Sequence, residues 1–176
     1  LPVILTVRSA KERGSVSTRR KLSDGERLEI FKACIPIADA VDVEYLSPVR
    51  CEVVSSARKS GKAVVLSYHN FGGTPRDKAL FKLAECMSGA GADVLKIACF
   101  AVEPSDSMRL LKLCKDWKKT PMAAMAMGEH GYIARLAGPA AGSRLNYGWV
   151  DKPSAPGQMH IKDVARLVRS ADALKR

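Results

Sequence analysis

The chain has 176 residues, 47% of them hydrophobic, and a formal net charge of +11 from 29 Lys and Arg against 18 Asp and Glu. This length and composition predict one globular domain and exclude a disordered or fibrous chain. No apolar stretch approaches the ~18 residues of a membrane-spanning helix, and the basic residues are spread over every segment without a nucleic-acid-binding motif. We therefore expect no membrane or nucleic-acid partner. The densest basic run, at residues 19–21, is interpreted first as part of a solvated loop and second as a region that attracts a small anionic substrate. Five dispersed cysteines without C-x-x-C spacing indicate no metal site and favour a soluble protein of the reducing cytoplasm.

Strand-like and helix-like segments alternate along the whole chain, ending in a helix at 161–173. Six β-α units without doubled strands predict an all-parallel sheet covered by helices. The predicted strands are 3–8, 40–46, 63–70, 93–100, 121–128 and 144–150. The predicted helix starts are the capping-box pair Ser23 and Glu26, the Ser47-Pro48 and Thr74-Pro75 pairs, and Ser105.

Polar residues inside these strands distinguish a closed barrel from an open sheet. In an open sheet with helices on both faces, both faces of a central strand should be apolar. Here polar residues alternate with apolar ones, so that one face of the sheet is apolar and the other carries ionisable groups. A barrel with a polar interior accounts for this pattern. The polar set is Thr6, Arg8, Asp42, Glu44, Ser67, His69 and Lys96.

Lys96 lies in the middle of the apolar segment GADVLKIACF. One interpretation is a lysine whose stem packs inside while its ammonium reaches water or pairs with a carboxylate. The other is a desolvated amine with a lowered pKa, which could attack a carbonyl carbon and form a Schiff base. The apolar residues on both sides of Lys96 favour the second interpretation.

His69 ends the strand that precedes the one with Lys96. It could be a core histidine bonded to a neighbouring carboxylate, or a neutral imidazole that transfers protons beside the lysine. Arg8 and Arg135 are candidates for binding a carboxylate or for structural ion pairs. Ser154 and Gln158 lie in the proline-containing loop KPSAPGQ, which could cover a substrate. No glycine-rich motif for a dinucleotide or a P-loop is present in the sequence.

The segments LTVRSAKE, DVE, SYHNF, DVLKIA, MGEHGYIARLAG and KPSAPGQ occur in this order. Together they resemble the type I 3-dehydroquinate dehydratases, from about residue 3 to residue 168. The resemblance implies a TIM (β/α)8 barrel, no metal and no cofactor, usually a homodimer, and conversion of 3-dehydroquinate to 3-dehydroshikimate through a lysine Schiff base. By the family's pattern the catalytic residues are Lys96, His69 and Glu12, and the substrate-binding residues are Arg8, Arg135, Ser154 and Gln158.

The first segment of this chain resembles the family's third strand. We therefore expect residues 1–176 to be a single barrel domain with about six of the eight βα units, the first two strands missing. Such a sheet could not close, so two strand edges would be bare or covered by something else. Two alternatives stay open: another Schiff-base barrel enzyme such as a class I aldolase, and an inactive barrel fragment acting as a binding module.

Overall fold

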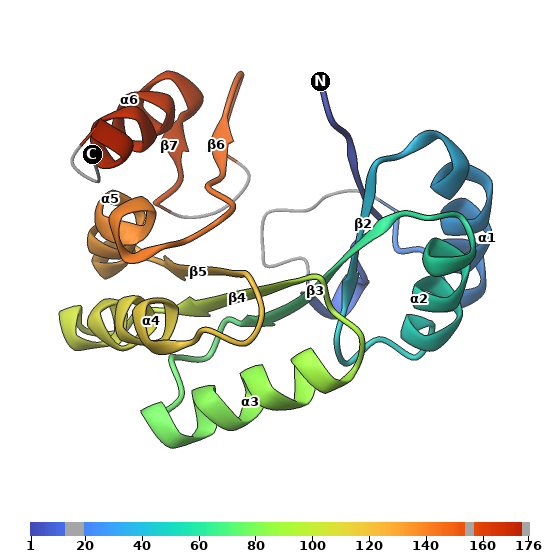
Figure 1. Ribbon diagram of the computed structural model, residues 1–176, viewed down its shortest axis with the longest axis horizontal. Helices are drawn as coiled ribbons and strands as arrows, with labels where there is room; N and C mark the ends of the chain where they lie inside the picture. Colours follow the sequence, from blue (N-terminus) through green and yellow to red (C-terminus); the bar gives the residue numbers. More distant parts are fainter. Residues whose placement is uncertain (13–19, 154–156, 174–176) are drawn as a thin grey trace.

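The computed structural model describes residues 1–12, 20–153 and 157–173. Its main sheet has five parallel strands in the order of the sequence. Figure 1 shows the helices that alternate with these strands around the outside of the sheet. The strands are β1 (Ile4–Thr6), β2 (Ala40–Glu44), β3 (Ala63–Asn70), β4 (Val94–Phe100) and β5 (Met122–Met127). The helices are α1 (Asp24–Cys34), α2 (Arg50–Lys59), α3 (Asp77–Gly89), α4 (Pro104–Asp116) and α5 (Tyr132–Ala141). Sequential parallel strands are typical of a β/α barrel, whereas a doubly wound sheet reverses its strand order.

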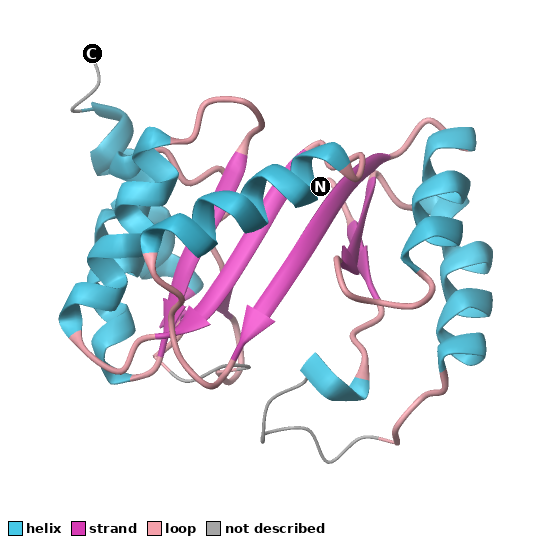
Figure 2. Cartoon of the chain, turned by 90° about the horizontal axis from the view of Figure 1, so that it is seen from below, coloured by secondary structure: helices cyan, strands magenta, loops and turns pink. Residues whose placement is uncertain are grey.

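The outer face of the sheet carries the main hydrophobic core. Val41, Leu66 and Ile97, on three neighbouring strands, are fully buried, and they pack with apolar residues of the helices. Figure 2 views the sheet from the side of α3 and shows this helix lying across the strands. Each such side chain contributes about 1.5–3 kcal/mol relative to an exposed one. The expected division of the strands into an apolar and a polar face is confirmed.

The expected sixth strand at 144–150 is wrong as a member of this sheet. Only Gly148–Trp149 forms a strand, β6, which pairs in parallel with β7 (Met159–His160) in a separate two-stranded sheet. The cause is local packing, because the Trp149 indole donates to the carbonyl of Gln158 at 3.1 Å and meets the ring of His160 edge-on. A side chain at Gly148 would lie 2.7 Å from Cα of Ile161, so only glycine allows this approach to α6 (Ile161–Ala173). β7 was not predicted.

The main sheet is open, as expected. Within residues 1–12, 20–153 and 157–173, β1 pairs with β2 alone and β5 with β4 alone, so the barrel is not closed. In Figure 1, β6, β7 and α6 lie together beyond α5, away from β1. No helix among these residues has the length and apolar character needed to cross a membrane.

One of the predicted helix starts is confirmed. At α1 the Ser23 hydroxyl accepts from the backbone N–H of Glu26, and the Glu26 carboxylate accepts from the backbone N–H of Ser23. The two predicted Pro-containing starts are wrong, since α2 and α3 each begin two residues after the proline. Thr74 does not cap α3, because its hydroxyl donates to the carbonyl of Phe100. Ser105 lies inside α4, one residue beyond the start of that helix.

Candidate active site

Lys96 projects from β4 into the polar face of the sheet. Its neighbours Leu95 and Ile97 are fully buried in the outer core, so strand alternation directs Lys96 to the opposite face. There its Nζ donates to Oδ2 of Asp42 at 2.8 Å, and its side chain is only 9% exposed. This geometry is compatible with both interpretations of Lys96, the desolvated reactive amine and the structural ion pair with a carboxylate.

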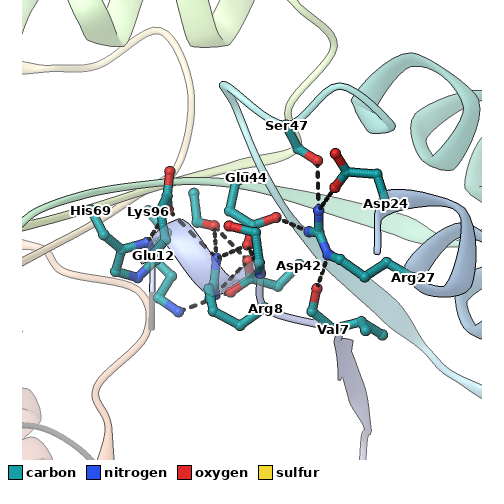
Figure 3. A network of polar contacts seen from close by, with 12 residues as sticks. Val7, Arg8, Glu12, Asp24, Arg27, Asp42, Glu44, Ser47, His69 and Lys96 are labelled. Carbon is teal, nitrogen blue, oxygen red and sulfur yellow. Dashed lines mark hydrogen bonds and ion pairs between the residues drawn. The ribbon is translucent and has the colours of Figure 1, made fainter. Parts of the chain in front are cut away.

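Asp42, on β2, is the centre of the polar cluster shown in Figure 3. Its Oδ1 accepts from the Ser67 hydroxyl at 2.6 Å and from the Arg8 guanidinium at 3.0 Å. Burial alone would raise the pKa of Asp42, but the ammonium of Lys96 and the guanidinium of Arg8 outweigh it and hold that pKa at about 2. The carboxylate is therefore ionised at neutral pH.

The environment of Lys96 contains opposing electrostatic effects. Burial lowers the pKa of Lys96, Asp42 raises it, and Arg8 lowers it again, so that the net shift is downward. The face of the Tyr147 ring lies 4.5 Å from Nζ, where it stabilises a positive charge on the nitrogen. Because the net shift of the pKa is downward, the neutral amine of Lys96 forms more readily than that of an exposed lysine.

His69 and Glu12 form the second part of the cluster. His69 Nδ1 lies 2.8 Å from Oε2 of Glu12, which comes from the short 3-10 helix Ala10–Glu12 after β1. Burial lowers the pKa of His69, the hydrogen bond to Glu12 raises it, and the charges of Arg8 and Lys96 lower it, with a net downward shift. When Nδ1–H donates to Glu12, Nε2 is left as the proton acceptor. A neutral imidazole of this kind can act as a general base.

Strand register brings His69 and Lys96 to the same region. Ser67 on β3 lies opposite Lys96 on β4, and His69 follows Ser67 by two residues on the same face. Arg8 joins the two parts of the cluster, because its guanidinium donates to Ser67 at 2.7 Å and approaches Glu12 at 4.0 Å. Arg8 was expected at the end of its strand, but β1 ends two residues earlier, at Thr6.

Arg135 and Gln158 lie outside the Asp42 cluster, on α5 and just before β7. Arg135 lies within α5, where burial lowers its pKa, and it lines a small cavity together with Met125 and Tyr147. The ring of Tyr147 therefore connects this cavity to Lys96. Gln158 directly precedes β7, and its carbonyl accepts from the indole of Trp149. The predicted residue Ser154 lies outside the described residues.

Sequence reasoning assigned no role to two residues of the site. Asp42 was recognised only as part of the polar face, and its contact with Lys96 depends on the register of three strands. Tyr147 was missed although it lies within the predicted strand 144–150, and in the structure it comes just before β6. Across the described part of the chain, no three His, Cys, Asp or Glu side chains are grouped as metal ligands would be.

The sequential parallel sheet and the ionisable cluster on its inner face define an α/β-barrel enzyme. The family model for type I 3-dehydroquinase matches residues 1–175, and the chain belongs to this family. The match gives no support to the aldolase alternative.

Individual relatives agree with the family assignment. The chain is 34% identical over 168 residues to the 3-dehydroquinate dehydratase of Pyrococcus abyssi, a match that covers 95% of this chain and 75% of that protein. It is 36% identical over 167 residues to that of Hydrogenobaculum sp., covering 93% of this chain and 72% of the relative.

Solved structures show the same fold. The crystal structure of the enzyme from Geobacillus kaustophilus has a TM-score of 0.88 at 29% identity, covering 99% of this chain and 69% of that one. The type I enzyme from Clostridium difficile, solved with covalently modified comenic acid, has a TM-score of 0.86 at 29% identity, covering 98% of this chain and 70% of that one.

Proposed function

We propose that the chain converts 3-dehydroquinate to 3-dehydroshikimate through a Schiff base on Lys96, as a lyase of the type I family. The observation that carries this proposal is the buried amino group of Lys96 with its lowered pKa, on the same sheet face as the His69–Glu12 pair. Relatives in the family are named 3-dehydroquinate dehydratases, and one of them was solved with a covalently modified ligand. A desolvated amine beside a neutral histidine is suited to imine formation and proton transfer.

The chemistry uses Lys96 and His69 in turn. Neutral Nζ of Lys96 adds to the C3 ketone, and loss of water with uptake of one proton from solvent gives an iminium that acidifies the C2 hydrogen. Nε2 of His69 removes this proton, and the electron pair forms an enamine. The enamine then expels the C1 hydroxyl, which takes the proton from His69 and leaves as water. Hydrolysis of the conjugated iminium releases 3-dehydroshikimate and restores the amine.

The remaining predicted residues bind the substrate in this proposal. Arg135 pairs with the carboxylate, which is supported by its position in the cavity that Tyr147 also lines. Arg8, Gln158 and Ser154 contact or cover the substrate oxygens. These contacts hold the substrate ring next to Lys96 and His69 before the reaction begins, and this prior positioning lowers the activation barrier. The homodimer and the cytoplasmic location implied by the family stay predictions.

Borohydride trapping tests the covalent step. Reduction of the iminium by borohydride should leave a secondary amine that joins Lys96 to the substrate carbon skeleton, detectable by peptide mass spectrometry. K96A should lose both the adduct and turnover, whereas K112A, at an exposed lysine paired with Asp116, should keep both. An adduct on a different lysine, or none with active protein, would overturn the proposal.

A further inference from the structure

The carboxylate of Asp42 is oriented by groups other than Lys96. Its Oδ1 accepts hydrogen bonds from the hydroxyl of Ser67 and from the guanidinium of Arg8, and its Oδ2 accepts one from Nζ of Lys96. Asp42 is 1% exposed and Ser67 is fully buried. The carboxylate thus keeps its position when the state of the lysine nitrogen changes.

We propose that Asp42 is the counter-ion of the Lys96 nitrogen, positioning it as an ammonium before reaction and stabilising the iminium that replaces it. This inference rests on the proposed Schiff-base function. An iminium is an effective electron sink only while it carries its positive charge, and a fixed carboxylate in a buried site stabilises that charge strongly. Asp42 acts through Lys96 and is therefore a positioning residue.

The same carboxylate makes the first step harder. Lys96 must lose a proton before it attacks, and Asp42 favours the protonated form, against the effect of burial. Asp42 therefore makes the free amine of Lys96 less available, but it stabilises the cationic intermediate that forms afterwards. The charged or titratable groups that act on the Lys96 nitrogen or face it are Asp42, Arg8, Glu12, His69 and Tyr147.

Removal of the carboxylate charge separates these two effects. In D42N the midpoint for acylation of Lys96 by acetic anhydride, followed against pH by peptide mass spectrometry, should move down by about one pH unit or more. Turnover of 3-dehydroquinate at saturating concentration should fall by about tenfold or more, since the iminium loses its counter-ion. D39N, which removes an exposed carboxylate just before β2, should change neither quantity.

The two readouts also distinguish this inference from the proposed function. The acylation midpoint needs no substrate, so an unchanged or raised midpoint in D42N would overturn the counter-ion role even if borohydride still traps an adduct on Lys96. A lowered midpoint without any trapped adduct in the wild type would instead overturn the Schiff-base function.

A second variant covers the case in which D42N does not fold. S67A keeps the charge of Asp42 but removes one of the two donors that fix Oδ1. We expect saturated turnover to fall several-fold while the acylation midpoint of Lys96 stays near its wild-type value. Unchanged turnover in S67A would contradict the positioning role.

Discussion

His69 Nδ1 lies 2.8 Å from Oε2 of Glu12, although 57 residues separate the two in the sequence. The contact links the C-terminal half of β3 to the short helix after β1. It fixes the ring so that Nε2 is free to take a proton, and it partly offsets the downward effect of burial on the pKa of His69. Orientation and basicity of His69 therefore depend on one carboxylate.

E12Q tests this dependence. Loss of the negative charge lowers the pKa of His69 further, so the neutral imidazole persists to lower pH and the acidic limb of the kcat profile should move to lower pH. The plateau should fall by about tenfold or more, because the ring is held less firmly. The control is E29Q, which changes an exposed carboxylate of α1 and should leave both the acidic limb and the plateau unchanged. Movement of the acidic limb to higher pH would contradict this account of His69.

The ring of Tyr147 gives a second prediction. Burial raises the pKa of Tyr147 to about 12, so the hydroxyl stays protonated, and the ring face meets the Lys96 nitrogen. Removal of the ring in Y147L should lower the pKa of Lys96 by about half a unit or more, since a buried cation–π contact contributes roughly 0.5–2 kcal/mol. Y147F retains the ring and should shift the pKa less. Equal shifts in both variants, measured by acylation against pH, would assign the effect to the hydroxyl.

The fold was largely predictable because strand-like and helix-like segments alternate along the chain, and because polar and apolar residues alternate within four of the predicted strands. β3 was predicted with its observed bounds, and β4 and β5 nearly so, since each combines an apolar outer set with clear ends. The segment 144–150 was overassigned because alternation alone does not reveal where a strand pairs. Its partner β7 has only two residues, Met159 and His160, and a segment this short shows no periodicity in the sequence.

The site was partly predictable for the same reason. Period two identified the face that holds Lys96 and His69, and the family resemblance supplied Glu12. Which polar neighbours touch depends on register between strands, which the sequence does not encode locally. The Asp42–Lys96 pair therefore could be found only in the assembled sheet.

Acid should weaken the fold through Asp42. Its folded pKa of about 2 lies below the ordinary value of 3.8, so its stabilising contribution is present above about pH 4 and is lost as the pH falls through about 2. The shift corresponds to roughly 2 kcal/mol in the free energy of unfolding. Urea unfolding at several pH values in this window should show a shallower loss of stability for D42N than for the wild type. An equal pH dependence in both proteins would contradict this contribution.

The last prediction concerns Arg27, a fully buried arginine of α1 that contacts the segment after β1 and the end of β2. Its guanidinium donates to the carbonyl of Val7 at 3.0 Å and pairs with the buried carboxylate of Glu44, as Figure 3 shows. R27M would remove the nearest cation of Glu44, which keeps the Arg8 guanidinium at 3.6 Å and the backbone N–H of Ser9 as partners. We therefore expect a loss of about 3 kcal/mol in the free energy of unfolding, measured by urea titration.

The double variant R27M/E44L distinguishes a buried charge from lost packing. If the weakened pairing of the buried Glu44 carboxylate causes the loss, removing that carboxylate as well should restore part of the stability, because paired buried ions can be replaced by apolar side chains at little cost. R166A, at an exposed pair with Asp163, should change stability by no more than about 0.5 kcal/mol. Additive losses in the double variant would show that Arg27 stabilises the fold mainly by packing and by its bond to Val7.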